Sequence, residues 1–281
     1  MTTAPRLTRW HENWDSGRYS VPGQGFHQEC VHPYLAAFLP QLINKSHPNW
    51  DSAFVPEDSL VPEDPSFGVD KSIVLIPLCG KTTDMIFLAQ QPYISALGLE
   101  AVPRAIHEFA TMVTEANGVA TTQFLHSKAQ HTFCFANQEK TSSGLIGIVE
   151  GDALDFKFDM RQVDAIWDRG SVVALRPEDR SAYITMLGLA LKIGGRVLLS
   201  VVEHDMVCVD ASDSAVPYGP PFSFSTKEVG ALYKQGYMHI VAELAREDKL
   251  ESEPRWKSKG ATIFEEVCYL LEKKVVCCND E

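Results

Sequence analysis

The sequence is short of basic side chains and has no long hydrophobic run. Its 281 residues contain 25 Lys and Arg against 37 Asp and Glu, so the formal net charge is -12. Because nucleic-acid binding depends largely on clustered cations that displace counterions, we expect no nucleic-acid partner. The longest apolar stretches, at 73–79 and 197–202, fall far short of the roughly 20 residues that cross a bilayer. We therefore expect no membrane association.

Paired cysteines and a secretory signal are also lacking. The chain has 7 cysteines, an odd number, and no Cys-x-x-Cys pair. This usage indicates reduced thiols rather than a disulfide framework or a zinc site. The first residues lead into polar and aromatic side chains without the apolar core of a signal peptide. We expect a cytoplasmic protein and a monomer, although no feature of the sequence bears on the second point.

His27, Cys30 and His32 are close enough in the sequence to raise the question of a metal site. Residues three apart share a helix face, whereas residues five apart do not, and no second cluster of ligands accompanies them. We expect no metal ion in this protein.

The chain divides into a covering segment and a main unit. Residues 1–45 are rich in aromatic side chains and then show helical spacing of apolar residues. Residues 47–70 are rich in Pro and acidic residues, and prolines at this density block regular hydrogen-bonded ladders. We predict that residues 1–70 form an arm, a helix and a solvated insertion that cover the active site. Residues 71–281 are expected to form a single structural unit.

From residue 72 onward, apolar runs alternate with helical patterns. The predicted strands are at 73–77, 94–100, 145–149, 163–167 and 196–202, and the predicted helices are at 82–91, 103–117, 177–192 and 225–235. This alternation is typical of a parallel α/β sheet. Two further strands, at 237–245 and 262–271, flank a loop and are compatible with an antiparallel edge strand.

Candidate ligand-binding residues follow the predicted strands. In open α/β sheets, ligands bind beyond the carboxyl ends of the strands. Gly80 follows the first strand and lets the backbone approach a ligand, and Glu100 ends the second, where a carboxylate can accept hydrogen bonds from both ribose hydroxyls. Gly151 and Asp152 follow the third strand, where an acidic residue can accept from an adenine amino group. These positions favour an adenosine-type ligand.

The turn after the first strand differs from two common phosphate-binding loops. It lacks Gly-x-Gly-x-x-Gly, so neither a dinucleotide pyrophosphate nor a nicotinamide dehydrogenase is indicated. Gly80-Lys81-Thr82 resembles the end of a Walker loop, but the earlier glycine of that loop is missing. The backbone of this turn is therefore not expected to cradle phosphates as a Walker loop does.

Motifs along nearly the whole chain resemble the thiopurine S-methyltransferase family. They are Trp10 and Trp14, Phe26-His27-Gln28-Glu29, Pro77-Leu78-Cys79-Gly80-Lys81, Gly98-Leu99-Glu100, Ile166-Trp167-Asp168-Arg169-Gly170, Gly219-Pro220-Pro221-Phe222 and Arg255-Trp256-Lys257-Ser258. The third and fifth are specific to that family rather than to methyltransferases at large. The resemblance implies a Rossmann-like α/β fold with a seven-stranded sheet, helices on both faces and an antiparallel edge strand.

The resemblance also implies S-adenosylmethionine as the cofactor. It assigns cofactor binding to Trp10, Trp14, Leu78, Gly80, Glu100, Gly151, Asp152 and Arg169. It assigns acceptor binding to Phe26, His27, Pro220 and Arg255. Three loops, at 15–25, 47–70 and 207–218, look longer than the family pattern and border the acceptor side. Their purpose and the identity of the acceptor stay open.

The chemistry of methyl transfer suggests a role for the aromatic residues. The positive charge of a sulfonium disappears as its methyl group moves, so a site that excludes water and holds the reacting atoms in line favours the reaction. Trp10, Trp14 and Phe26 could form an aromatic wall with a cation–π contact to the sulfonium. The alternative is that they only anchor the N-terminal arm to the core.

The acceptor sulfur must be electron-rich. A nearby guanidinium lowers the pKa of a thiol because it favours the anion. We expect Arg169 and Arg255 to act in this way, with Asp15 or Asp168 as a proton acceptor or orienting partner. Aromatic and heterocyclic thiols are already largely ionised near neutral pH, so positioning alone can suffice. Whether a dedicated general base exists stays open.

The sequence therefore predicts an enzyme that methylates the sulfur of a small aromatic or heterocyclic thiol. Two alternatives remain. One is a methyltransferase for halides, inorganic thiols or selenium species, which a smaller acceptor pocket would favour. The other is a sensor that binds S-adenosylmethionine without turnover. Arg169 and the aromatic arm favour an enzyme, because a pure binding protein needs no acceptor-side groups.

Overall fold

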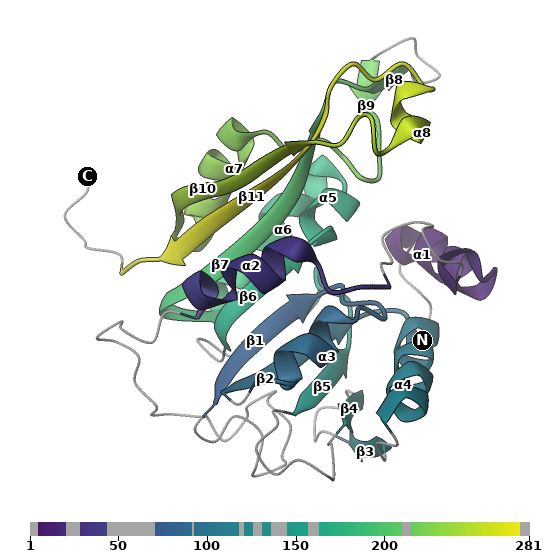
Figure 1. Cartoon of the computed structure of the whole chain (residues 1–281), viewed down its shortest axis with the longest axis vertical. Helices are drawn as coiled ribbons and strands as arrows, with labels where there is room; N and C mark the ends of the chain where they lie inside the picture. Colours follow the sequence, from purple (N-terminus) through teal and green to yellow (C-terminus); the bar gives the residue numbers. More distant parts are fainter. Residues whose placement is uncertain are drawn as a thin grey trace.

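A mixed β-sheet between two layers of helices organises this chain (Figure 1). The computed structural model describes residues 5–20, 29–43, 71–91, 93–117, 121–125, 131–135, 145–156, 163–209 and 215–275. No helix within these ranges is long and apolar enough to span a membrane.

Nine strands of the described chain form the sheet, in the order β10-β11-β7-β6-β1-β2-β5-β4-β3. Their bounds are β1 (Ser72–Pro77), β2 (Ile94–Glu100), β3 (Thr121–Leu125), β4 (His131–Phe135), β5 (Ile146–Glu150), β6 (Val163–Arg169), β7 (Leu191–His204), β10 (Met238–Asp248) and β11 (Phe264–Lys273). Strands β5, β2, β1, β6 and β7 pair in parallel, whereas β11 is antiparallel to both β7 and β10.

The predicted seven-stranded sheet with an antiparallel strand pair at its edge is confirmed. Strands β10, β11, β7, β6, β1, β2 and β5 make up this sheet, and the antiparallel strand β11 lies one place inside the edge. The hairpin of β3 and β4 extends the opposite edge by two strands. A separate small sheet pairs β8 (Val207–Val209) with β9 (Ala215–Pro217).

The start of β7 differs from the prediction. The strand was predicted to begin at residue 196, but Gly194 and Gly195 lie within it, and the pairing with β6 shifts register there. A Cβ on Gly195 would lie 2.7 Å from the carbonyl oxygen of Asp164, so only glycine permits this close approach. The chain thus enters the sheet directly at the end of the preceding helix.

Helices cover both faces of the sheet, as predicted. On one face lie α2 (Pro33–Leu42), α3 (Asp84–Ala89) and α4 (Pro103–Asn117), and on the other lie α5 (Ser171–Ala174), α6 (Arg180–Ala190) and α7 (Thr226–Tyr233). A capping box stabilises the start of α7, in which Ser225 and Glu228 satisfy each other's backbone N–H groups. The predicted helix over 177–192 is shorter, with a 3-10 turn over Pro177–Asp179 leading into α6.

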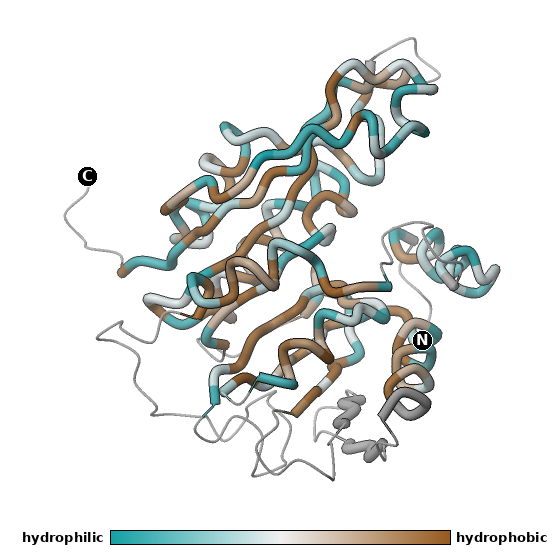
Figure 2. The backbone as a smooth tube through the Cα atoms, viewed as in Figure 1, coloured by the Kyte–Doolittle hydropathy of each residue, from teal (hydrophilic) through white to brown (hydrophobic). Residues whose placement is uncertain are grey.

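Strand β1 shows how the sequence fills two apolar cores. Ile73 and Leu75 join the cluster under α6 and α7, whereas Val74 and Ile76 join the cluster under α2, α3 and α4. Successive side chains of a strand point to opposite faces, so an uninterrupted apolar run is what a doubly covered strand requires. Figure 2 shows the hydrophobic residues concentrated along these central strands.

A buried carboxylate ties β6 to the helices above it. Asp168 is 0% exposed, and its Oδ2 accepts hydrogen bonds from the hydroxyls of Tyr183 in α6, at 2.9 Å, and Tyr233 in α7, at 3.3 Å. Burial raises the pKa of Asp168 to about 6, although hydrogen bonds from Tyr183, Val172 and other donors oppose the shift. Asp168 is therefore packed against α6 and α7 and does not line a cavity.

The raised pKa of Asp168 gives a pH-dependent contribution to stability. A carboxyl group with a raised pKa in the folded state stabilises fully below its unfolded pKa of 3.8, and this contribution is lost as the pH rises through about 6. The Asp168→Asn variant lacks that loss. Its free energy of unfolding relative to the wild type should therefore rise by about 2 kcal/mol between about pH 4 and pH 7. Urea denaturation at several pH values measures the difference, and a difference independent of pH would contradict this assignment.

Candidate functional site

A cavity of about 230 Å³ opens at the carboxyl ends of β1, β2, β5 and β6. Helix α1 (Pro5–Asp15) contributes to its wall as well. Nine residues singled out from the sequence line it, namely Trp10, Trp14, Leu78, Gly80, Glu100, Gly151, Asp152, Arg169 and Pro220. Parallel strands end at the same edge of a sheet, which is why residues so distant in sequence meet here.

The turn after β1 brings backbone close to the cavity. Leu78 and Gly80 both have positive φ angles, 47° and 53°, and for leucine this conformation is strained. The N–H of Gly80 donates to Oε2 of Glu100 over 2.8 Å. A Cβ at Gly80 would lie 3.4 Å from the ring of Trp14, so glycine also lets the aromatic arm approach the turn.

Glu100 is a buried carboxylate at the end of β2. Its Oε2 accepts from Gly80, and its Oε1 accepts from the N–H of Val102 over 2.9 Å. Burial raises the pKa of Glu100, while these backbone hydrogen bonds oppose the shift. Each carboxylate oxygen has a second lone pair, so Glu100 can still accept from two adjacent hydroxyl groups.

Asp152 offers a further acceptor on the same cavity. Its Oδ1 accepts from the N–H of Leu154 over 3.0 Å. Its Oδ2 is buried and forms an ion pair with Nη2 of Arg6 over 2.7 Å. The same arginine nitrogen also donates to Asp155 over 2.6 Å. A carboxylate oxygen has more than one lone pair, so Oδ2 can accept from the amino group of a ligand as well.

Two tryptophans of α1 face the cavity. Trp10 and Trp14 are four residues apart and therefore share a helix face. Trp14 contacts Tyr19 edge to face at 5.4 Å between ring centroids, and both pack against Val102 and Ala105 at the start of α4. Figure 1 shows α1 beside α4. The aromatic residues thus anchor the arm and line the cavity at once.

The end of β6 supplies the charged wall of the cavity. The indole Nε1 of Trp167 donates to Oδ2 of Asp84 over 2.8 Å, and both residues line the cavity. Burial lowers the pKa of the Arg169 guanidinium, while the charges of Glu266, Asp84 and Glu253 act in the opposite direction. Arg169 is thus a cation in a water-poor environment, where it can favour an anion more strongly than in bulk water.

The structure does not bring every predicted residue to the cavity. Asp15 ends α1 and is exposed, and Arg255 lies in α8 (Pro254–Lys257), half exposed and 2.8 Å from Glu253 in an ion pair. Glu253 is also among the charges that act on Arg169, so the loop of Arg255 neighbours the site without lining it. Phe26 and His27 lie outside the described residues.

Several lining residues were not anticipated from the sequence. They include Arg6, Lys81, Asp84, Trp167 and Phe222. Trp167 and Phe222 belong to family-like motifs, which could have indicated them, whereas Asp84 and Arg6 carry no local signal. No group of three or more His, Cys, Asp or Glu residues within the described ranges could hold a metal ion.

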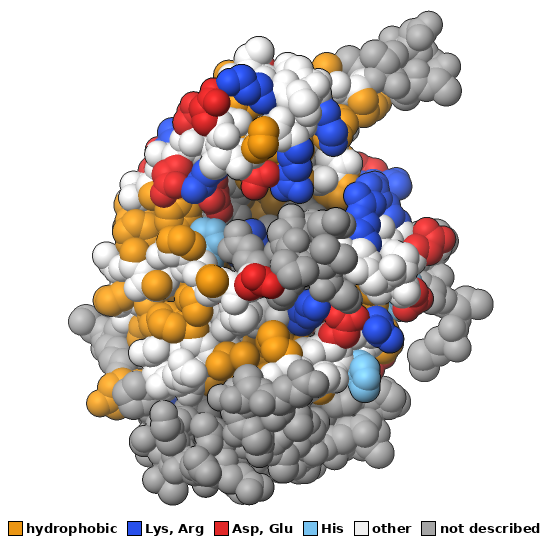
Figure 3. Space-filling model, turned by 45° about the vertical axis from the view of Figure 1, so that its right-hand side comes forward, with side chains coloured by type: hydrophobic (Ala, Val, Ile, Leu, Met, Phe, Trp, Pro, Cys, Tyr) orange, Lys and Arg blue, Asp and Glu red, His pale blue; other side chains and the backbone are white. Residues whose placement is uncertain are grey.

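The protein surface carries charges of both signs. The face turned forward in Figure 3 carries Lys and Arg side chains beside Asp and Glu rather than a patch of one sign. Near the cavity, Lys81 donates to Glu108 over 2.9 Å, and its Nζ lies 6.0 Å from the ring centroid of Trp14. Lys81 is therefore held by local partners.

Glycine at position 80 should be needed for the shape of the turn. The Gly80→Ala variant keeps a positive φ that alanine adopts at a cost, and its methyl group would contact Trp14. We expect a loss of about 1 kcal/mol in the free energy of unfolding. Gly17→Ala is the control for strain alone, because it has a φ of 72° with nothing within 4 Å of the added Cβ. If Gly80→Ala and Gly17→Ala lose the same free energy of unfolding and the ligand site is unchanged, the position of Trp14 does not depend on the close approach at Gly80.

Comparisons of the sequence with known proteins point to one family. A model of the thiopurine S-methyltransferase family matches residues 66–274. A thiopurine S-methyltransferase of Nitrosospira multiformis is 32% identical over 263 residues, which cover 93% of this chain and 96% of that protein. A relative of the same name from Xanthomonas axonopodis pv. citri is 30% identical, with 94% and 98% of the two chains covered.

Solved structures with this fold are more distant. An arsenic(III) S-adenosylmethionine methyltransferase from Chlamydomonas reinhardtii aligns with a TM-score of 0.52 at 14% identity, over 88% of this chain and 76% of that chain. A SAM-dependent methyltransferase from Methanosarcina mazei aligns with a TM-score of 0.50 at 14% identity, over 77% and 99%. At this level of identity the similarity concerns the fold alone.

Proposed function

Since this chain belongs to the thiopurine S-methyltransferase family, we propose that it transfers the methyl group of S-adenosylmethionine to the sulfur of a small aromatic or heterocyclic thiol. One observation carries the proposal. The half-buried guanidinium of Arg169 lines the same cavity as Glu100 and Asp152. A nucleoside-binding edge and an anion-stabilising wall therefore face a single space.

The cavity residues fit S-adenosylmethionine in detail. Glu100 has free lone pairs for the two ribose hydroxyls, and Asp152 Oδ2 can accept from the adenine amino group. Gly80 and Gly151, which carry no side chain, line the cavity together with Leu78. Gly151 admits no Cβ, which would lie 2.7 Å from the ring of Phe156.

The aromatic arm would protect the reacting centre. When bound, the cofactor supplies a methyl group on a positively charged sulfur. Trp10 and Trp14 exclude water from that position and offer aromatic faces to a cation. We predicted that residues 1–70 cover the site. The contribution of α1 to the cavity wall supports this prediction.

Arg169 would act on the acceptor. Its guanidinium favours the thiolate over the thiol, so the proton leaves to solvent before methyl transfer. Arg169 can also hold the carboxylate end of the cofactor, since the two tasks need only different donors of the same guanidinium fork. Pro220 lines the cavity, and its role in acceptor binding stays a prediction. Roles for Phe26, His27, Arg255 and Asp15 stay predictions.

A reducing compartment suits the thiols of this chain. Cys30, Cys79, Cys208 and Cys268 are free cysteines, and burial raises the pKa of the Cys79 thiol well above its ordinary value. Cys79 is therefore a neutral, packed residue rather than a nucleophile. We infer a cytoplasmic location, and the monomeric state stays a prediction.

Glu100 should determine cofactor affinity. In Glu100→Gln one carboxylate oxygen becomes an amide nitrogen, which cannot accept from Gly80 or Val102 or from a ribose hydroxyl. We expect the Kd for S-adenosylmethionine to rise about 10-fold or more, measured by titration calorimetry. Glu251→Gln, an exposed carboxylate that pairs with Lys257 outside the cavity, is the control and should leave the Kd unchanged.

Arg169 should determine turnover. Removal of a preorganised charge from the wall should lower kcat/KM for thiophenol by about 100-fold in Arg169→Ala. The assay follows radiolabelled methyl transfer at saturating cofactor. Arg196→Ala in β7 is the control. Its side chain binds Glu272 and the carbonyl oxygen of Gln41 and does not line the cavity. Unchanged kinetics in Arg169→Ala would remove the basis of the mechanism.

A panel of acceptors tests the function itself. Thiopurines, thiophenol, bisulfide, iodide and selenite are offered with radiolabelled S-adenosylmethionine, alongside calorimetric binding of the cofactor. Transfer to the aromatic thiols supports the proposal. Transfer only to the small anions would replace it with an inorganic acceptor, and cofactor binding without any transfer would favour a sensor.

A further inference from the structure

Arg180 is a charged side chain in the interior of the protein. It is the first residue of α6 and only 1% of its surface is exposed. Its Nη1 donates to the carbonyl oxygen of Ser223, and its Nη2 donates to those of Phe222 and Ser223, each over 3.2 Å. The guanidinium lies 4.4 Å from the ring centroid of Phe224. A buried charge is costly, so its hydrogen bonds to two successive carbonyls have to offset that cost.

The two carbonyls belong to segment 219–224, which contributes to the cavity wall. Phe222 of this segment lines the cavity. The N–H of Phe222 donates to the carbonyl oxygen of Val173 over 2.7 Å, and Nε2 of His204 lies 3.0 Å from the carbonyl oxygen of Pro221. Residues from α5, α6 and β7 thus hold the backbone of a segment that faces the cavity.

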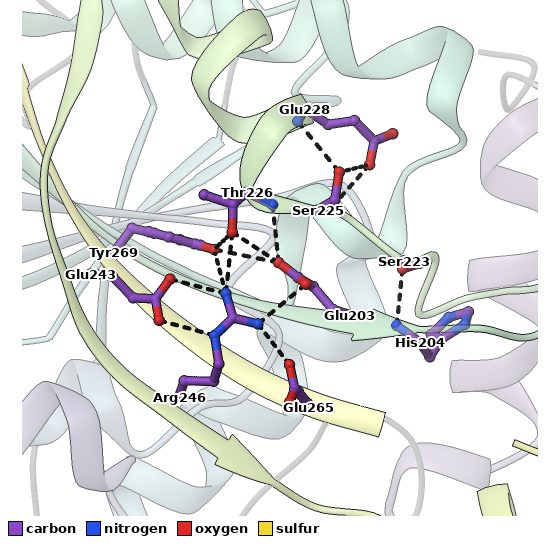
Figure 4. A network of polar contacts seen from close by, with 10 residues as sticks. All are labelled: Glu203, His204, Ser223, Ser225, Thr226, Glu228, Glu243, Arg246, Glu265 and Tyr269. Carbon is purple, nitrogen blue, oxygen red and sulfur yellow. Dashed lines mark hydrogen bonds and ion pairs between the residues drawn. The ribbon is translucent and has the colours of Figure 1, made fainter. Parts of the chain in front are cut away.

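The far end of the segment is held too, as Figure 4 shows. The hydroxyl of Ser223 accepts from the backbone N–H of His204 over 2.9 Å. Further along, the N–H of Thr226 donates to Glu203 over 2.9 Å, and Arg246 donates to the Thr226 hydroxyl over 3.1 Å. The end of the segment is fixed in this way, and in its middle Arg180 binds the carbonyl oxygens of Phe222 and Ser223, beside the contacts of Val173 and His204.

We propose that Arg180 is a positioning residue that sets Phe222 as the wall against which the aromatic ring of the acceptor rests. This inference rests on the proposed function. A neutral side chain at position 180 would leave the carbonyl oxygens of Phe222 and Ser223 without these donors. The wall would then shift, and a planar acceptor would lose contact with the Phe222 ring.

The consequence is a selectivity between acceptors. A flat aromatic thiol needs the wall for its orientation, whereas bisulfide is too small to depend on it. Arg180 therefore affects the KM of the aromatic acceptor and leaves both the cofactor Kd and the KM of bisulfide unchanged. A residue that served only global stability would not distinguish these constants.

The test compares Arg180→Lys and Arg180→Met with the wild type. Lysine keeps the charge but presents a single point donor in place of the planar fork. We expect the KM for thiophenol to rise about 10-fold in Arg180→Met and less in Arg180→Lys, with the cofactor Kd within about twofold. Arg196→Lys is the matched control, because it alters a partly buried arginine far from segment 219–224.

A double-mutant cycle tests whether Arg180 acts through the wall. In the Phe222→Ala background, Arg180→Lys should change the KM for thiophenol by less than about twofold, because the wall is already absent. If Arg180→Lys raises the KM for thiophenol as much in the Phe222→Ala background as in the wild type, the proposal is contradicted. Arg180→Lys retains a buried cation, so the cycle remains measurable if Arg180→Met does not fold.

Hydrogen exchange gives a readout that does not depend on activity. In Arg180→Lys the amides of Phe222 and Phe224 should exchange about 10-fold faster, while that of Gly80 keeps its wild-type rate. Unchanged exchange would overturn the inference even if turnover fell. A wild-type protein that methylates no thiol would refute the proposed function, and the exchange result would still decide whether Arg180 holds this segment.

Discussion

The alternation of side chains at the end of β6 is the constraint on which the site depends. Trp167 and Arg169 point toward the cavity, where Asp84 accepts from the indole. Asp168, between them, points the opposite way and binds the hydroxyls of Tyr183 and Tyr233. The same three residues therefore fasten α6 and α7 to the sheet and present a cation to the ligand. A shift of one residue in register would bury the arginine among the tyrosines and expose the carboxylate to the cavity.

Nearby carboxylates balance the positive charge of Arg169. Burial opposes ionisation of Glu266, but hydrogen bonds from His32 and Ser200 and the charge of Arg169 lower the pKa of Glu266 to about 2. Glu266 is thus an anion at neutral pH, and together with Asp84 it keeps the guanidinium charged despite its burial. This arrangement holds a cation ready at the cavity wall, so little reorganisation is required when an anionic acceptor arrives.

Residues at strand ends could be predicted because a local pattern places them. Gly80, Glu100 and Asp152 each follow an apolar run, and parallel strands bring such positions together. Arg180 and Asp84 could not be predicted, since each lies at the start of a helix and acts on groups more than forty residues away. Their roles depend on tertiary packing, which leaves no periodic signal in the sequence.

The acceptor side was the hardest to predict for the same reason. Asp15 was chosen for its charge and Arg255 came from a family-like motif, but neither lines the cavity: Asp15 is exposed at the end of α1, and Arg255 is half exposed in α8. Pro220, from another of the seven family-like motifs, does line it. The motifs thus located one acceptor-side residue and not the other, because a charged side chain is equally stable in solvent.

The most direct test of the account is a crystal structure of the protein with S-adenosylhomocysteine and thiophenol. The account predicts the ribose hydroxyls on Glu100, the thiol sulfur within hydrogen-bonding distance of the Arg169 guanidinium, and the aromatic ring against Phe222. A thiol bound away from Arg169, with the cofactor in place, would contradict it.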